Sequence, residues 1–229
     1  MEKLSFIIVS MLITHMTFAQ QEVFEKSIDF KDQRIDLQAD FASQVSISNW
    51  DKREVKVKIT YELNGGELNE AVEIDLREQE HRIRLKLDID ERMMRNADVR
   101  DCEKEDAMTW GSRNGPRVCA DIFVEVFLPK GTDLVMESVI ADILVNGEFK
   151  DLDIKTVTGD IDLTWPEKHG ADIQLKTVNG SIYTNFDFKA TRDKGLPIIS
   201  SHDLETIYKD GGRYMKLETV TSDIYLRKG

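Results

Sequence analysis

The sequence predicts an all-β protein, with a β-solenoid-like stack of short repeats in parallel rungs that is preceded by further β-strands. Three observations lead to this fold class. Most of the chain after residue 20 alternates apolar and polar residues, which is typical of half-buried strands. The region 131–229 contains four copies of one short segment. Each copy is too short to bury its own apolar face, so the copies must stack on one another.

The first element is a predicted signal peptide over residues 1–19. Lys3 is followed by an apolar run from Leu4 to Ile13, and Thr17-Phe18-Ala19 places small residues where a signal peptidase cuts, before Gln20. That run is too short for a stable bilayer anchor. No later stretch is apolar enough to span a membrane, so we expect no integral membrane segment after cleavage. The mature protein is then exported, to the periplasm or to the extracellular cell surface.

Residues 20–130 form the predicted N-terminal β region, in which Val55–Tyr61 and Ile83–Ile89 alternate as strands do. A polar segment without clean periodicity then predicts a long loop at about 91–117. An exported chain meets an oxidising compartment, so the two cysteines, Cys102 and Cys119, predict a disulfide that ties this loop. A metal site and a reactive thiol are the alternatives, although two cysteines without a nearby histidine make a poor zinc site.

Residues 131–229 form the repeat region, which we expect to continue the preceding β region as a single domain. Its four copies are Leu134–Val145, Leu152–Leu163, Ile173–Thr184 and Met215–Leu226. Each copy has two alternating halves that are out of phase, and the change of phase lies between Thr156 and its neighbour Val157 in the second copy. Alternate residues of a strand face opposite sides, so this change predicts a bend in every copy.

The bend also predicts which residues lie inside. The predicted repeat core comprises Val139, Ile143, Val157, Gly159, Ile161, Val178, Gly180, Ile182, Val220 and Ile224. The two glycines share their place with Ala141 and Ser222 in the other copies, as expected where a neighbouring backbone crowds the bend. Stacking should also bring Glu137 beside Lys155.

The acidic composition excludes some partners. The formal net charge is −12, and such a chain repels phosphate backbones, so we expect no nucleic acid partner. One aspartate recurs after the bend as Asp142, Asp160 and Asp223. This column is either a calcium site or a set of solvated turn aspartates, and no segment has the spacing of a calcium-binding loop. We therefore predict no metal site and no cofactor.

No residues are predicted to be catalytic. Ser201-His202-Asp203 has the composition of a catalytic triad, but consecutive residues of a strand point to opposite faces. Trp165, Tyr183 and Tyr225 lie at or near the ends of repeat strands. A sugar or a peptide could stack on them there, or they could close the edge of the core.

Several segments carry a family resemblance. A strand ends in the turn Pro129-Lys130-Gly131, and copies of a Thr-Val-x-Gly-x-Ile motif follow, as in Thr156–Ile161 and Thr177–Ile182. With the earlier segment Val45–Val57, they resemble the putative adhesin family, the head-domain auto-transporter adhesin-like β-strand repeat proteins of unknown function. The resemblance runs from about Ile35 to the end and implies a repeat fold without catalytic residues. The cysteine-bearing segment is not part of the family pattern.

These features favour a non-enzymatic exported cell-envelope protein, an adhesin or binding scaffold whose partner is an envelope protein or a glycan. In this hypothesis the loop from Glu91 to Pro116 gives specificity. One alternative is a periplasmic regulatory or stress-response module that binds a membrane signalling protein. A second alternative is a polysaccharide-active enzyme on a β-helix-like scaffold.

Overall fold

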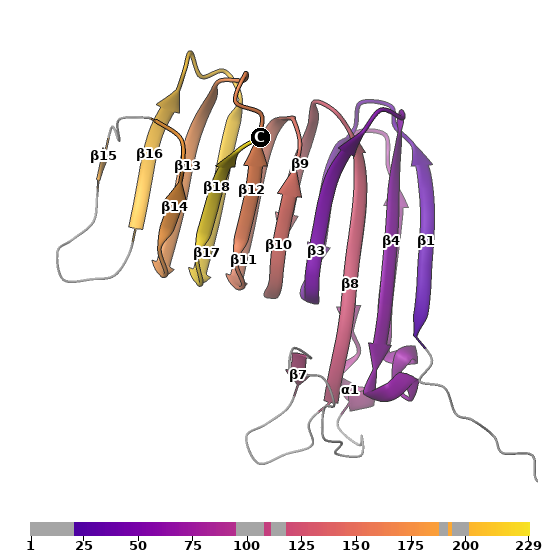
Figure 1. The fold of residues 1–229 in the computed structure, drawn as a ribbon. Coiled ribbons are helices and arrows are strands. Elements are labelled where there is room, and N and C mark those ends of the chain that lie inside the picture. The colour runs from indigo at the N-terminus through magenta and orange to yellow at the C-terminus, as the bar shows by residue number, and fades with distance from the viewer. Residues whose placement is uncertain (1–20, 95–107, 111–117, 188–191, 194–201) are drawn as a thin grey trace, which may run out of the picture.

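The chain is all-β throughout the residues that the structure describes, with only single-turn helices between strands (Figure 1). The structure is a computed structural model that describes residues 21–94, 108–110, 118–187, 192–193 and 202–229. The expected signal peptide lies outside these ranges. The strands are β1 (Glu22–Asp29), β2 (Arg34–Ala39), β3 (Phe41–Trp50), β4 (Glu54–Leu63), β5 (Val72–Glu78), β6 (Arg82–Ile89), β7 (Met108–Trp110), β8 (Val118–Pro129), β9 (Thr132–Glu137), β10 (Ile140–Asn146), β11 (Phe149–Thr158), β12 (Ile161–Trp165), β13 (Ala171–Asn179), β14 (Ile182–Thr184), β15 (Arg192–Asp193), β16 (His202–Tyr208), β17 (Tyr214–Thr221) and β18 (Ile224–Lys228). The helices are η1 (Asn64–Gly66), η2 (Asn69–Ala71) and α1 (Glu91–Met94).

The strands form two ladders within one 18-stranded mixed sheet. The first ladder runs in the order β5, β6, β2, β9, β11, β17, β13, β16, β15. The second runs β1, β4, β8, β3, β10, β12, β18, β14, and β7 also pairs with β8. Pairing is parallel in the middle of both ladders. Antiparallel strands extend the ends, so the sheet differs from the purely parallel stack that we expected.

Bent pairs of consecutive strands connect the two ladders. Among the described strands, five strands of the first ladder are followed within two residues by a strand of the second ladder, and we call each such pair a bent unit. Their order in the stack is β2–β3, β9–β10, β11–β12, β17–β18, β13–β14. The unit β17–β18 therefore lies between two units that precede it in the chain, as Figure 1 shows for β11, β17 and β13. Strands of the N-terminal region and of the repeats share both ladders.

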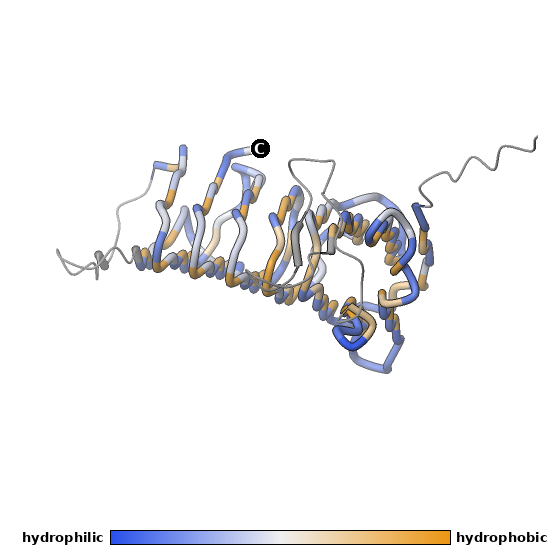
Figure 2. Tube along the Cα trace, turned by 90° about the horizontal axis from the view of Figure 1, so that it is seen from below, coloured by the Kyte–Doolittle hydropathy of each residue, from blue (hydrophilic) through white to orange (hydrophobic). Residues whose placement is uncertain are grey.

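The apolar core lies between the inner faces of the two ladders. Figure 2 shows hydrophobic and hydrophilic residues alternating along the strands. In the unit β11–β12, Leu152 and Ile154 point inward from the first ladder, and Ile161 and Leu163 point inward from the second. Burying each such side chain contributes about 1.5–3 kcal/mol relative to leaving it exposed. Because one strand alone cannot bury its apolar face, the stacking of units stabilises the fold.

The structure corrects the predicted register at the bend. We expected the valine of each copy to face the core, but Val139 is 39% exposed and Val157 is 40% exposed. Val178 and Val220 are half-buried. The side chain that faces inward is that of the hydroxyl residue immediately before the valine. The alternation of inward and outward side chains then changes phase at the small residue of the bend, two positions after the valine. The isoleucines Ile143, Ile161 and Ile224 are fully buried, whereas Ile182 is half-buried.

The loop that we expected at about 91–117 contains α1 and β7, and β7 pairs antiparallel with β8. Residues 95–107 and 111–117 lie outside the described ranges. Cys119 is on β8, but Cys102 is among the residues that the structure does not describe. The disulfide between them stays a prediction.

Candidate functional site

Buried hydroxyl groups explain the threonine of the repeat motif. Thr156, Thr177 and Thr219 are fully buried at the inner side of their bends. The Thr177 hydroxyl donates to the carbonyl oxygen of Ser222 at 2.9 Å, and the Thr219 hydroxyl donates to that of Gly159 at 3.2 Å. Sharp bends leave carbonyl groups without ladder partners, and an unpaired buried carbonyl is destabilising. The hydroxyls satisfy these carbonyls and bind neighbouring units together.

Close packing of neighbouring units explains the glycine of the motif. Gly159 has φ +131°, and a Cβ placed on it would lie 1.9 Å from the carbonyl oxygen of Ala141 in the next unit. A Cβ on Gly180 would meet the carbonyl oxygen of Ser222 at 1.8 Å. Ser222 has φ 143°, which non-glycine residues seldom adopt, and its hydroxyl accepts a hydrogen bond from the Gly159 N–H at 3.2 Å.

A ladder of carboxylates lies on the outer side of the same bends. Asp142 accepts a hydrogen bond from the backbone N–H of Asp160 at 2.9 Å, and Asp160 accepts one from that of Asp223 at 2.9 Å. Asp223 accepts one from the N–H of Ser181 at 2.7 Å. The recurring aspartates thus each accept a hydrogen bond from the backbone of the next unit. In the described part of the chain, no group of three or more His, Cys, Asp or Glu residues could hold a metal ion.

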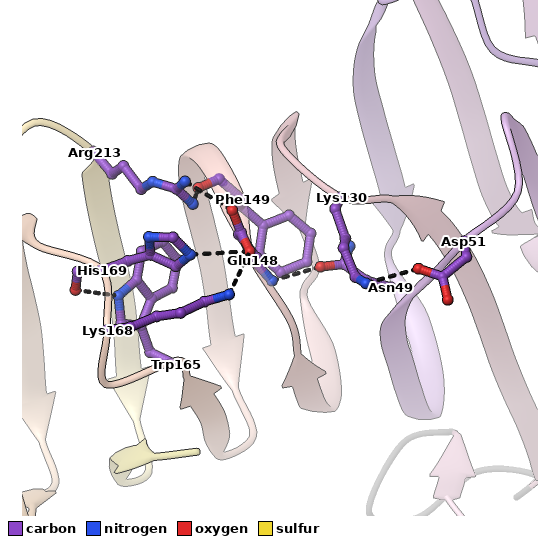
Figure 3. A network of polar contacts seen from close by, with 9 residues as sticks. All are labelled: Asn49, Asp51, Lys130, Glu148, Phe149, Trp165, Lys168, His169 and Arg213. Carbon is purple, nitrogen blue, oxygen red and sulfur yellow. Dashed lines mark hydrogen bonds and ion pairs between the residues drawn. The ribbon is translucent and has the colours of Figure 1, made fainter.

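A second polar cluster connects the turns at the opposite ends of the bent units (Figure 3). Glu148, between β10 and β11, pairs through Oε1 with Nη2 of Arg213 at 2.8 Å. Its Oε2 lies 3.0 Å from Nε2 of His169 and 3.8 Å from Nζ of Lys168. The indole N–H of Trp165 donates to the His169 carbonyl at 3.2 Å. The cluster therefore joins the turns before β11, β13 and β17.

The electrostatics of Glu148 oppose a role in proton transfer. Burial raises the pKa of its carboxyl, but hydrogen bonds with Arg213 and His169 outweigh burial and hold the pKa below its usual value. A general acid needs a raised pKa near the working pH. Glu148 instead stays a charged carboxylate with both oxygens engaged, which is the arrangement of a structural ion-pair network.

The outer face of the first ladder is densely charged with both signs. Lys216 on β17 lies 3.7 Å from Asp153 on the neighbouring strand β11 and 3.3 Å from Glu218 on its own strand. Lys176 lies 3.5 Å from the same Glu218. Burial raises the pKa of Glu218, but the surrounding lysines outweigh burial and lower it. In register, Lys155 pairs with Glu137, as the repeats predicted. The lysines and carboxylates of this face pair with one another, so few of its charged groups are left to bind a ligand.

The outer face of the second ladder differs in part. Its strands β1, β4 and β8 also carry cross-strand ion pairs, between Lys56 and Glu25 and between Lys58 and Glu125. Its strands β3, β10, β12, β18 and β14 instead carry hydroxyl, amide and aromatic side chains around and beside a shallow depression. We call this surface the polar face. It comprises Ser46, Ser48, Leu144, Asn146, Asp162, Thr164, Tyr183, Tyr225 and Arg227. Its two charged side chains pair with each other, because Nε of Arg227 donates to both Asp162 oxygens, at 2.8 Å and 3.1 Å.

Two tyrosines stack at one end of the polar face. The rings of Tyr183 and Tyr225 lie 5.1 Å apart between centroids and are inclined by 12°. Tyr183 is 50% exposed. Arg227 lies over the Tyr225 ring at 5.1 Å. Burial and the neighbouring carboxylates of Asp160 and Asp223 raise the pKa of Tyr225, so its hydroxyl remains a donor.

The sequence named part of this surface. Trp165, which we grouped with the two tyrosines, is fully buried in the core and offers nothing to a ligand. The sequence indicated Tyr183 and Tyr225 as candidates for stacking on a ligand, but it did not indicate Asp162 and Arg227. Asp162 on β12 and Arg227 on β18 can be recognised as neighbours only when the stacking order of the units is known. In the segment Ser201-His202-Asp203, which we did not predict to be catalytic, Ser201 lies outside the described residues. Asp203 is on β16, opposite Lys176.

Comparison with known proteins supports the fold. The fold is similar to that of a putative cell adhesion protein from Clostridium sporogenes ATCC 15579, with a TM-score of 0.53 and 12% sequence identity, over 92% of this chain and 100% of that chain. A putative adhesin from Bacteroides fragilis NCTC 9343 matches with a TM-score of 0.27 and 11% identity, over 91% of this chain and 97% of that one. No protein-family model and no curated protein matches the sequence. The first likeness shows an adhesin-like fold.

The described residues contain no helix that has both the length and the apolar character needed to cross a membrane.

Proposed function

We propose that this chain is a non-enzymatic, exported adhesin-like protein of the cell envelope, a solenoid-like scaffold that holds a partner against the polar face. The observation that carries this proposal is the contrast between the two outer faces. On the first face, opposite charges pair across β11, β17 and β13, whereas the strands β3, β10, β12, β18 and β14 of the second face present hydroxyls and amides around a depression, with a pair of stacked tyrosines beside it. Exposed polar and aromatic groups that are not needed for packing mark a binding surface.

The geometry of the repeat motif supports a scaffold role. The hydroxyl residues, the small residues and the aspartates of the bends bond to or pack against the neighbouring units, so the motif builds the stack rather than a reaction centre. The fold-level likeness to a putative cell adhesion protein points in the same direction.

In-cell crosslinking of the tagged chain, with mass spectrometry of the captured material, tests the proposal. Leu144 is a 40% exposed aliphatic residue on the polar face. Leu144→Arg should abolish capture. Val135→Arg, an outward aliphatic position on the first ladder, is the matched control and should capture the same material.

Two outcomes would change the assignment. Equal capture by both variants would show that the polar face does not bind the partner. Capture of a single membrane signalling protein by the unmodified chain would favour the regulatory alternative over adhesion.

A further inference from the structure

We propose that the stacked tyrosines Tyr183 and Tyr225 are a carbohydrate platform, on which a sugar ring of a neutral glycan stacks beside the Asp162–Arg227 pair. This inference rests on the proposed function and names the ligand class of the polar face.

The tyrosine pair offers an exposed aromatic surface. β14 pairs only with β18 among the described strands, and Tyr225 covers one face of the Tyr183 ring. The Tyr183 side chain is nevertheless 50% exposed. Ring faces carry partial negative charge and attract polarised hydrogens. The C–H face of a sugar ring supplies such hydrogens on a flat apolar surface.

Hydrogen-bonding groups lie in the same register row. Asp162 pairs across the ladder with Tyr225, and Tyr225 pairs with Tyr183. The Asp162–Arg227 ion pair uses Nε of the guanidinium. The terminal nitrogens of Arg227 and the remaining lone pairs of Asp162 are then placed to donate to and accept from sugar hydroxyls. Fixed donors and acceptors beside an aromatic ring distinguish one hydroxyl arrangement from another.

The composition of the face favours a glycan over a protein. The buried core of a protein interface is more apolar than its rim. Leu144 is the one exposed aliphatic side chain of the polar face, because Ile47 and Val145, which also line the depression, are buried. Backbone pairing occupies both sides of β10, β12 and β18, which leaves them unable to receive an added strand. The paired charges of Asp162 and Arg227 cancel, which suits a neutral ligand on a chain of net charge −12.

The depression indicates a ligand longer than one sugar. It extends from Arg227 across Asp162 and Leu144 to Ser46, and neighbouring strands of a ladder lie about 4.8 Å apart. Serine, asparagine and threonine side chains line it. An oligosaccharide that starts on Tyr183 can continue along this row, so affinity should rise with chain length.

Isothermal titration calorimetry of the mature chain with neutral oligosaccharides of hexose and N-acetylhexosamine, in increasing length, tests the proposal. Tyr183→Ala should weaken binding about tenfold or more, as loss of a stacked ring does in other aromatic platforms. Tyr183→Phe keeps the ring and should retain most of the affinity. Tyr214→Ala removes a 42% exposed tyrosine from the first ladder and should change nothing.

The outcomes separate the inference from the proposed function. Absence of binding to every oligosaccharide, or equal affinities of the Tyr183→Ala and Tyr214→Ala variants, overturns the carbohydrate platform. If Leu144→Arg still abolishes capture of envelope material in that case, the proposed function stands with a protein partner. If Leu144→Arg and Val135→Arg capture alike, the proposed function fails, whatever the oligosaccharides do.

Discussion

Three residues of the motif stabilise each bend in different ways. In the copy at Thr156–Ile161, a hydroxyl lies inside, a glycine lets the next backbone approach, and an aspartate bonds outward to a neighbouring N–H. The sequence predicted the need for a small residue, because the same position recurs as alanine, glycine or serine. It could not predict that threonine rather than valine faces inward, since valine is the more apolar of the two.

Gly159→Ala should lower the free energy of unfolding by about 2–4 kcal/mol, because a backbone carbonyl occupies the space of the new Cβ and φ is positive. Gly212→Ala is the control, since its φ is +93° but nothing lies within 4 Å of its Cβ position. Chemical denaturation of both variants measures the difference. Equal losses would mean that backbone strain alone, without the close approach, accounts for the glycine.

Asp160→Ala should cost about 1 kcal/mol, because the N–H of Asp223 loses its acceptor. Asp160→Asn keeps an oxygen at that place and should lose less. Thermal melts with calcium and with a chelator should coincide for the unmodified chain, since the aspartate carboxylates of the bends already accept hydrogen bonds from backbone N–H groups. A melting temperature that rises with calcium would restore the metal interpretation of the column.

At the scale of the element, the three bent units that begin with β11, β13 and β17 are held at both ends. The bend carries the hydroxyl and carboxylate contacts, and the turns at the other end carry the cluster around Glu148. The strand alternation predicted the units from the sequence. The Glu148 cluster was not predictable, because its members come from turns that are brought together only by the stacking order.

Val157→Asp and Ile161→Asp together test the register. Val157 is 40% exposed, so a charge there should change stability by less than about 1 kcal/mol. Ile161 is fully buried, and an unpaired buried charge should cost about 3–5 kcal/mol or prevent folding. Circular dichroism and urea titration compare the two variants. The reverse order of stabilities would restore the register that the sequence suggested.

Glu148→Gln should make stability less dependent on acid. The folded-state pKa of Glu148 is lowered, so its ion pairs contribute stability above the usual carboxyl pKa of 4.5. That contribution is lost as pH falls through the lower, folded-state pKa. Unfolding free energies of the two proteins should therefore differ most near neutral pH and converge in acid. A gap that stays constant with pH would assign the effect to packing alone.

At the scale of the whole molecule, the stacking order departs from the chain order. The sequence predicted all-β structure and repeats, and it predicted that Glu137 and Lys155 of the first two copies lie side by side, which they do. It did not predict that β17 also pairs with β11. Nothing local in a strand specifies which of several similar strands it joins, because the same alternation fits every partner.

Deletion of residues 214–229 should abolish cooperative unfolding, because β11 loses one of its two parallel partners in the first ladder, β13 loses its parallel partner, and the inward side chains of both lose cover. Deletion of β1 (Glu22–Asp29) is the control, since among the described strands β1 pairs only with β4 at the end of its ladder. Near-ultraviolet circular dichroism and dye binding to exposed apolar surface report the difference. A cooperative transition in the shorter chain would show that β11 and β13 can join directly.

The position of β17–β18 between two units that precede it in the chain has a consequence for folding during synthesis. A nascent chain that has reached β14 contains both neighbours of this unit but not the unit itself, so the interior cannot close when those neighbours emerge. The β13–β14 end of the stack therefore takes its native pairing only after β17–β18 has been made. If the chain leaves the cytoplasm as we propose, β17–β18 must cross the membrane before that end of the stack can form.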